Sequence, residues 1–179
     1  CIDDASWQTP QNRLPQQTQQ FTFDRIVGQK IALSALQNAI NSNRIAPAYL
    51  FAGPDGVGKT LSAIAFIHQW LDIVNPQNHP DLLWLEPTYV HQGELIAATR
   101  ATEGELLCKT PPAIGIDQIR KVSQFLSSSS LSAAAKVVVI EKADAMQSAA
   151  ASALLKTLEE PTAGILILIS SNPAQLLPT

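Results

Sequence analysis

Residues 53–60 read GPDGVGKT, and this stretch decides the fold. It matches the phosphate-binding pattern GxxxxGK[ST] at every fixed position. Glycines let successive backbone N–H groups turn inward around phosphates, and the lysine brings an ammonium to the β and γ oxygens. The threonine hydroxyl is a ligand for Mg²⁺. We therefore expect a nucleotide site built from Gly53, Pro54, Asp55, Gly56, Val57, Gly58, Lys59 and Thr60.

The segments that flank the loop have the character that such a site requires. Residues 48–52, AYLFA, predict a short buried strand, and residues 61–71 predict a helix with apolar residues along it. A strand, this loop and the N-terminus of a helix together form an anion site. The alternative is a glycine-rich turn that matches the pattern by chance, and both flanks argue against it.

The rest of the chain alternates strands with helices. Further strands are predicted at 82–86, 136–141 and 164–170, and further helices at 28–43, 117–126 and 146–160. Residues 136–141 are apolar on both faces, which is typical of a central parallel strand. Asp117 is expected to cap the helix that it begins, and residues 87–112 carry no prediction. The alternation indicates an α/β fold, a doubly wound parallel sheet with helices on both faces and the ligand at the carboxyl ends of the strands.

Bulk composition limits the class of protein. The 179 residues are 46% hydrophobic and 15% charged, which is enough for one globular domain with a core. The net charge of −3 gives no general attraction to nucleic acid, so any DNA contact has to be local. The first twenty residues are polar and no apolar run reaches membrane-spanning length, so we expect a cytoplasmic protein with no membrane partner. Residues 1–20 are interpreted as a disordered lead-in rich in Gln and Pro, and residues 21–179 as the folded domain.

Cysteine and histidine usage argues against a metal framework. Cys1 and Cys108 are the two cysteines, neither lies in a CxxC pair, and the three histidines are scattered. The chain begins with Cys1 rather than methionine and stops at Thr179 just after an apolar segment. We interpret it as a fragment of a longer protein.

A second site is expected at the end of the strand at 136–141, and it departs from the usual pattern. ATP-hydrolysing proteins of this build usually end such a strand in Asp-Glu, where the Asp helps to hold Mg²⁺ and the Glu polarises the attacking water. Here the pair is Glu141-Lys142. Glu141 is still a carboxylate that can serve Mg²⁺, whereas the Lys142 ammonium has no lone pair to offer water. General-base catalysis contributes roughly 10²–10⁴-fold, so we expect slow or absent hydrolysis and assign no catalytic residue.

Two alternatives bear on this second site. Asp144 lies three residues beyond Glu141 and is a candidate base, although its place before the next helix favours a capping role. Lys142 is alternatively a harmless surface residue in a chain whose base lies elsewhere.

Several segments together resemble bacterial clamp-loader AAA+ subunits. These are FDRIVGQ at 23–29, RIAPAYLF at 44–51, the phosphate loop, and ALLKTLEEP at 153–161, which is a highly specific signature of the group. The resemblance covers roughly residues 21–179. HPD at 79–81 and IDQIR at 116–120 are more similar to the non-motor subunit than to the gamma/tau motor subunit, and the Glu141-Lys142 pair points the same way.

The resemblance implies a place in the clamp loader of DNA polymerase III, a pentamer that opens the ring-shaped sliding clamp and closes it around primed DNA. The non-motor subunit completes the arc formed with the gamma/tau and delta subunits and presents an arginine to a neighbour's ATP site. The resemblance also implies ATP or ADP with Mg²⁺ as cofactor, held by the loop, with Thr60 and Glu141 on the metal. It places adenine-side contacts near Val27 and Gly28, and a γ-phosphate sensor at Ser171 with Asn172 beside it.

The chain also departs from the family pattern. Many relatives carry four zinc-binding cysteines where residues 72–78 here have none, so we expect no zinc. The family's Ser-Arg-Cys motif would follow Thr179, so we expect a partial AAA+ domain that stops before the fifth core strand, the lid and the collar. The implied sheet order is 48–52, 164–170, 136–141, 82–86, which leaves the first strand as an unprotected edge. Lys156 and Arg120 are candidates to face DNA phosphates or another subunit.

Two other functions remain open from the sequence. One is an active ATPase of the gamma/tau type. The other is a small-molecule kinase with a phosphate loop, which needs arginines that close over the phosphoryl group. The chain's arginines form no such cluster in the sequence; they are Arg13, Arg25, Arg44, Arg100 and Arg120.

Overall fold

A computed structural model describes residues 22–73, 79–91, 94–103, 110–160 and 164–176, and the predicted lead-in at 1–20 lies outside them. Four strands form a parallel sheet in the order β1-β6-β5-β2, which confirms the order expected from the resemblance. Their bounds are β1 Ala48–Ala52, β2 Leu82–Leu85, β5 Lys136–Ile140 and β6 Gly164–Ser170. Each strand therefore lies within one residue of its predicted bounds.

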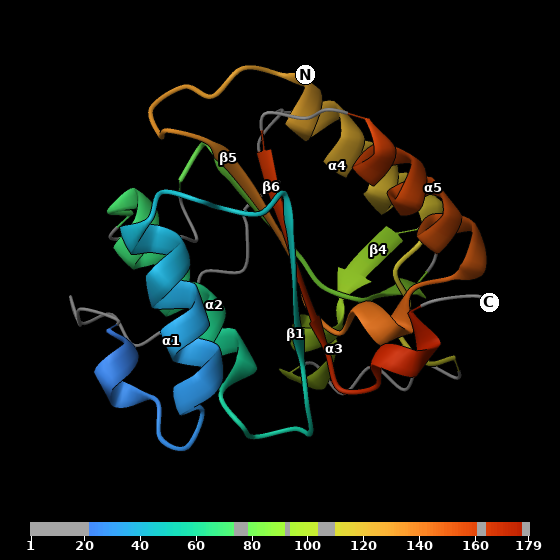
Figure 1. Cartoon of the computed structure of the whole chain (residues 1–179). Coiled ribbons are helices and arrows are strands. Elements are labelled where there is room, and N and C mark those ends of the chain that lie inside the picture. Colours follow the sequence, from blue (N-terminus) through green and yellow to red (C-terminus); the bar gives the residue numbers. More distant parts are fainter. Residues whose placement is uncertain (1–21, 74–78, 92–93, 104–109, 161–163, 177–179) are drawn as a thin grey trace.

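Helices cover both faces of this sheet (Figure 1). One face carries α1, Lys30–Asn41, and α2, Lys59–Leu71. The other carries α4, Ile116–Ser127, and α5, Ser148–Glu159, which pack against each other. The doubly wound α/β architecture is confirmed, and none of the helices described is long and apolar enough to span a membrane.

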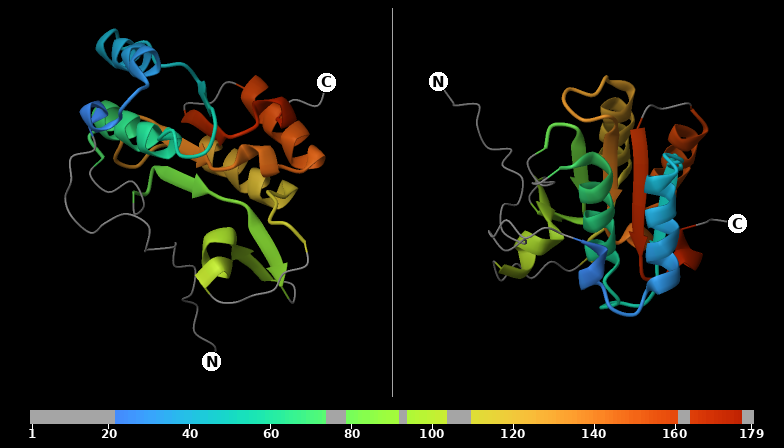
Figure 2. Two further views of the ribbon diagram at one scale, coloured as in Figure 1. Left: turned by 90° about the horizontal axis from the view of Figure 1, so that it is seen from below. Right: turned by 60° about the vertical axis from the view of Figure 1, so that its left-hand side comes forward.

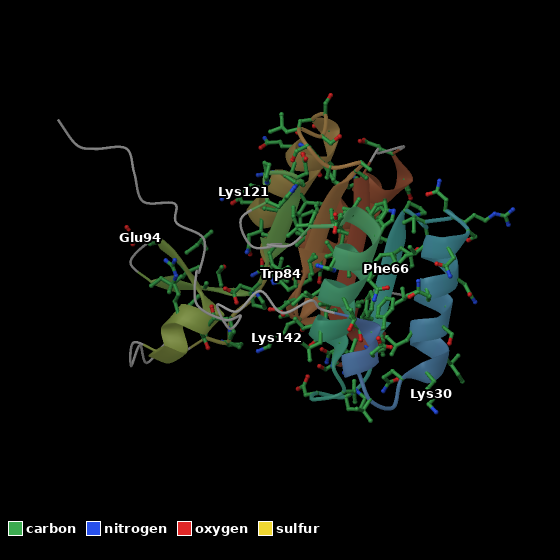
Figure 3. The ribbon with its side chains drawn as sticks, turned by 90° about the vertical axis from the view of Figure 1, so that its left-hand side faces the viewer. Lys30, Phe66, Trp84, Glu94, Lys121 and Lys142 are labelled. Atoms are coloured by element: carbon green, nitrogen blue, oxygen red, sulfur yellow. The ribbon has the colours of Figure 1, made fainter. Side chains whose placement is uncertain are left out.

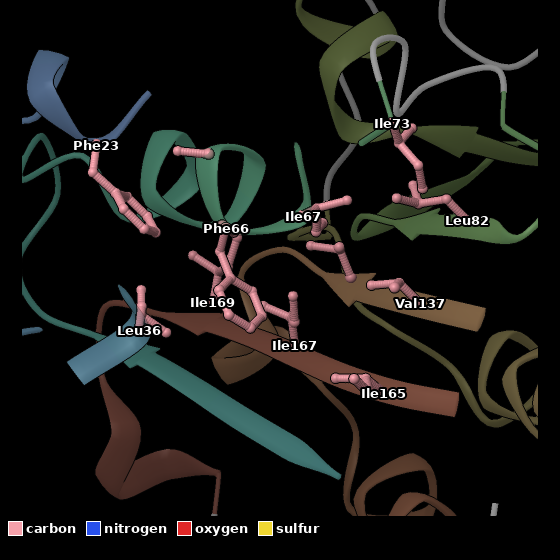
Figure 4. Packing of buried hydrophobic residues seen from close by; sticks show 13 residues of the cluster. Phe23, Leu36, Phe66, Ile67, Ile73, Leu82, Val137, Ile165, Ile167 and Ile169 are labelled. Carbon is pink, nitrogen blue, oxygen red and sulfur yellow. The ribbon is translucent and has the colours of Figure 1, made fainter. Parts of the chain in front are cut away.

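The first core layer lies between α1, α2 and one face of the sheet. Phe66 points from α2 onto β6, where Ile167 and Ile169 lie beneath it (Figure 4). Tyr49 packs at a tilt against the Phe66 ring, with the two ring centroids 5.0 Å apart. Leu36 from α1 closes this layer on its outer side.

The second core layer uses the alternate residues of the same strands. Val138 and Ile140 of β5 join Leu166 of β6 against α4 and α5, whereas Val137 and Val139 belong to the first layer. Successive strand residues point to opposite faces, so a strand buried on both sides must be apolar throughout. All five residues of β5 are buried, as predicted for a central strand.

Residues 87–112, which carried no prediction, contain a small β-hairpin and a short helix outside the main sheet. β3, Thr88–His91, pairs antiparallel with β4, Glu94–Ala97, and the short helix α3, Ala98–Glu103, follows. Both views of Figure 2 show this hairpin standing away from the main sheet. Its exposed cross-strand pair, Val90 opposite Leu95, gives it little apolar burial.

The segment His79-Pro80-Asp81 holds in place the loop at 131–133, which lies just before β5 in the sequence. The fully buried Asp81 carboxylate accepts hydrogen bonds from the backbone amides of Leu131, Ser132 and Ala133 at 2.7–2.8 Å. Burial by itself would raise the pKa of Asp81, but these amide hydrogen bonds outweigh it and hold that pKa far below its usual value. A charged carboxylate therefore organises the turn that leads into β5.

The predicted role of Asp117 is wrong. α4 begins after Gly115, whose N–H is bound at 3.1 Å by the Gln118 side chain reaching back from the first turn. Asp117 instead pairs with Arg120 at 2.8 Å on the exposed surface. An acidic residue near a helix start thus indicated the helix correctly but not which residue caps it.

Candidate functional site

The phosphate loop connects β1 to α2 at the carboxyl end of the sheet. Gly56 and Gly58 have φ angles of 85° and 87°, a left-handed conformation that favours glycine. The N–H of Gly53 donates to the Ser170 carbonyl at 3.3 Å, which ties the loop to the end of β6. α2 begins at Lys59, so its first N–H groups, which have no acceptor within the helix, face the loop.

Lys59 is held inside the loop, and its side chain is only 10% exposed. Its ammonium donates to the carbonyls of Gly53 at 2.6 Å and Pro54 at 2.8 Å. It also donates to Ser171 Oγ at 3.3 Å. This contact joins Lys59 to Ser171, the residue that follows β6, although the two lie 112 positions apart in the sequence.

Asp55 joins the same group from the tip of the loop. Its carboxylate accepts a hydrogen bond from the Ser171 hydroxyl and lies 3.6 Å from the Lys59 ammonium. The Ser171 hydrogen bond lowers the pKa of Asp55, with desolvation opposing it and the positive charges of Lys59 and Lys142 adding to it. Asp55, Lys59 and Ser171 therefore form one connected polar cluster.

Thr60 and Glu141 form the second contact of the site. The Thr60 hydroxyl donates to Glu141 Oε1 at 3.1 Å, in a partly buried position at the end of β5. A hydroxyl and a carboxylate beside a phosphate loop are the hard oxygen ligands that Mg²⁺ prefers. The two side chains present therefore fit the metal that accompanies nucleoside phosphates, and Glu141 is long enough to reach the Thr60 hydroxyl.

Lys142 follows β5 directly and is exposed to solvent (Figure 3). Its backbone is left-handed, with φ of 48°, which is uncommon for a residue with a side chain. Lys142 thus lies at the carboxyl end of the sheet, beside the phosphate loop. Its positive charge is close enough to help lower the pKa of Asp55.

The predicted capping role of Asp144 is wrong as well. Asp144 lies in a short 3-10 turn, Ala143–Ala145, and α5 is preceded by Gln147. Its Oδ1 accepts hydrogen bonds from Ser170 Oγ at 2.8 Å and from the Ser171 N–H at 3.1 Å. The carboxylate therefore points across to the end of β6 and fixes Ser171, a role that its separation of 26 residues from Ser170 concealed.

The remaining site predictions lie along the segment before α1. Ile26 approaches Gly58, where a Cβ on the glycine would lie 3.7 Å from Ile26 Cγ2. Val27 is 91% exposed, and Gly28 has a φ of 93°. A cavity of about 250 Å³ opens between α1, β1 and the start of α2, and its lining includes Gln29, Leu36, Tyr49, Val57 and Lys59. Adenine contacts at Val27 and Gly28 stay a prediction.

The structure thus brings Lys59, Thr60, Glu141 and Ser171 to one edge of the sheet, as the motifs predict. Sequence reasoning missed Ser170 and the positioning contacts of Asp144. The available signal was a pair of hydroxyl residues at the end of one buried strand and an acidic residue just beyond its neighbour. Because carboxyl ends of parallel strands share an edge, such residues are expected to meet. The predicted zinc-free segment, 72–78, lies mostly outside the described residues.

Comparisons with known proteins agree with this geometry. A family model described as DNA polymerase III, delta subunit, matches residues 28–179. The chain is 32% identical over 151 residues to DNA polymerase III subunit delta′ of Pseudomonas aeruginosa, covering 75% of this chain and 40% of the relative. It is 30% identical over 160 residues to DNA polymerase III subunit tau of Bacillus subtilis, covering 87% of this chain and 26% of the relative.

A solved structure supports the same assignment. A DNA polymerase III gamma subunit-related protein of Thermotoga maritima superimposes with a TM-score of 0.59 at 26% identity, covering 82% of this chain and 41% of that one. The chain spans less than half the length of each of these relatives. The family match over most of the chain, the parallel sheet with its phosphate loop and the agreement with both relatives lead to one conclusion: the chain belongs to the DNA polymerase III delta subunit family of clamp-loader proteins.

Proposed function

We propose that the chain is part of a delta′-type subunit of a DNA polymerase III clamp loader, which binds an adenine nucleotide with Mg²⁺ and hydrolyses it slowly or not at all. The observation that carries this proposal is Lys142, an exposed ammonium directly after the metal-binding candidate Glu141. The cluster around Lys59 and Ser171 supports binding, and the lysine where a proton acceptor is usual argues against turnover.

Each residue has a defined task in this proposal. The loop amides and Lys59 bind the phosphates, and Thr60 with Glu141 holds Mg²⁺. The metal, when bound, neutralises phosphate charge. Asp144 keeps Ser171 facing Lys59, so the end of β6 stays in register with the loop. None of these groups activates water, and the subunit acts as a binding and assembly partner.

The partners follow from family membership. We propose that the subunit assembles with gamma/tau and delta subunits and reaches primed DNA and the sliding clamp through that complex. The net charge of −3 supports indirect contact with DNA, because it gives the isolated chain no general affinity for phosphate backbones. A cytoplasmic location follows from the same proposal.

Nucleotide titration tests the binding function. Labelled ATP and ADP are titrated with Mg²⁺ against the full chain, its Lys59→Ala variant and a Lys156→Ala control on the exposed surface of α5. Loss of the Lys59 ammonium removes charge-assisted hydrogen bonds and should weaken binding about 10- to 100-fold, while the control binds like wild type. Equal binding by Lys59→Ala and wild type would remove the proposed site.

An active motor subunit is the second candidate, and the 30% identity to subunit tau over 87% of the chain favours it. Replacement Lys142→Glu in the assembled complex separates the two. If the chain is deficient only in the base, the variant gains hydrolysis by up to about 10²–10⁴-fold. A wild-type site that already hydrolyses ATP at the rate of the motor subunits, with no gain in Lys142→Glu, favours the motor.

A further inference from the structure

The polar cluster at the loop tip contains one group that the proposed function leaves without a role, the carboxylate of Asp55. Its side chain is 91% exposed, yet it accepts a hydrogen bond from Ser171 Oγ and lies 3.6 Å from the Lys59 ammonium. Lys59 in turn donates to the same Ser171 hydroxyl. Asp55 is therefore an anion that accepts a hydrogen bond from one group of the phosphate site and forms an ion pair with another.

Those two donors are the ones that a terminal phosphate requires. The lysine of a phosphate loop reaches the β and γ oxygens, and Ser171 Oγ lies 3.3 Å from that ammonium. A γ-phosphate oxygen held by Lys59 therefore comes within reach of the Ser171 hydroxyl. The Asp55 carboxylate already contacts both of these groups, and it would repel a phosphate anion that approaches them.

The backbone that carries Ser171 is held in place by hydrogen bonds. The Ser171 N–H is bound to Asp144 at 3.1 Å, and the neighbouring Asn172 N–H donates to Ser170 Oγ at 3.1 Å. The end of β6 is thereby fixed on both sides of Ser171. Asp55, which is exposed on the loop, is the member of the cluster that has to move outward when a third phosphate enters.

We propose that Asp55 is a specificity-determining residue of this site, whose carboxylate competes with a γ-phosphate for Lys59 and Ser171 and so favours a nucleoside diphosphate over a triphosphate. The inference rests on the proposed nucleotide-binding function. A diphosphate bound by the loop amides leaves the Asp55–Ser171 contact in place, whereas a triphosphate replaces it. Lys59 gives up its contacts with the Gly53 and Pro54 carbonyls when either nucleotide binds. The free-energy cost of losing them therefore cancels in the ratio of the two affinities.

The ratio of dissociation constants for ADP and a non-hydrolysable ATP analogue, both with Mg²⁺, measures this competition in the full chain. Asp55→Ala removes charge and acceptor and should shift the ratio toward the triphosphate by about tenfold, the equivalent of one charge-assisted hydrogen bond. Asp55→Asn keeps an acceptor of the same shape without the charge and should give a smaller shift in the same direction. Asp72→Asn, an exposed carboxylate at the end of α2, is the matched control and should leave the ratio unchanged.

Two outcomes overturn the inference in distinguishable ways. If ADP still binds but neither Asp55 variant shifts the ratio by more than about twofold relative to Asp72→Asn, Asp55 has no role in selection and the binding function stands. If neither nucleotide binds wild type with saturation, the proposed function falls and the inference falls with it. Asp55→Asn preserves side-chain volume and guards against a loop change in the alanine variant.

Discussion

Single polar residues in this chain act mainly by holding backbone segments in place. Asp81 binds three consecutive amides of the loop before β5, and Asp144 binds the end of β6. Among the residues that the structure describes, neither carboxylate forms a salt bridge with a lysine or an arginine. Backbone amides, and not salt bridges, therefore stabilise these two carboxylates. Because hydrogen bonds are directional, these contacts also fix the conformation of the segments that donate them.

The Asp81 contacts predict a pH-dependent effect on stability. In Asp81→Asn the amide NH₂ faces a backbone N–H, so we expect a loss of about 2–3 kcal/mol in the free energy of unfolding at pH 7. Because folding lowers the pKa of Asp81, its contribution is complete above the unfolded value of about 3.9 and declines as the pH falls below it. Urea unfolding at pH 7 and pH 3 should therefore show a smaller difference between variant and wild type in acid.

The matched control is Asp72→Asn, which removes an exposed carboxylate at a left-handed position that asparagine tolerates. It should change the free energy of unfolding by less than about 0.5 kcal/mol at either pH. An Asp81→Asn deficit of the same size at pH 7 and pH 3 would contradict the role given to the charge.

At the scale of elements, the start of β6 shows why a glycine is needed next to α4. A Cβ on Gly164 would collide with Leu126 Cδ2 and lie 3.1 Å from the backbone oxygen of Lys136. Leu126 is itself buried in the second core layer, so it has little room to retreat. The close approach of strand and helix therefore depends on the missing side chain.

Gly164→Ala should lower the free energy of unfolding by about 1–3 kcal/mol, the usual cost of overpacking a close contact. The measurement is chemical denaturation followed by circular dichroism. Gly115→Ala serves as the control, because a Cβ there meets only Gln147 Oε1 at 3.9 Å and the change should be smaller. Equal effects of the two substitutions would show that the β6–α4 contact adjusts without strain.

Helices and strands are the features of this fold that the sequence predicts best, and particular residues show why. β6 is an uninterrupted apolar run between Gly164 and Ser170, so both of its ends can be predicted from the sequence. The β3–β4 hairpin was not predictable, because Val90 and Leu95 are exposed and its strands lack alternating burial. Lys59, Thr60 and Glu141 follow from motif and topology, whereas the contact of Asp144 with Ser170 follows only once β5 and β6 are known to be neighbours.

The whole molecule is two apolar layers that share the central strands. Val138 faces α4 and α5, and Val139, the next residue, faces α1 and α2. The tryptophans described, Trp70 and Trp84, pack against the first layer only. Because one strand supplies both layers, we expect the domain to unfold as a single cooperative unit.

Val138→Ala tests this cooperativity from the layer that lacks tryptophan. The lost methyl groups and the cavity should lower the free energy of unfolding by about 2 kcal/mol. Tryptophan fluorescence and circular dichroism should report the same shift in midpoint. Val90→Ala, on the exposed hairpin, should change it by less than about 0.5 kcal/mol. A fluorescence transition that stays at the wild-type midpoint in Val138→Ala would show two layers that unfold independently.

Lys136 has a consequence of a different kind, because its ammonium is enclosed at the start of the central strand. The residue is 7% exposed, and its Nζ donates to the Phe125 carbonyl and to Ser128 Oγ while lying over the Phe125 ring. Acylating reagents need an accessible amine, so we expect them to label the exposed Lys30, Lys142 and Lys156 and to spare Lys136. The rate at which Lys136 is acylated should therefore report how often the end of α4 separates from the sheet and exposes this amine.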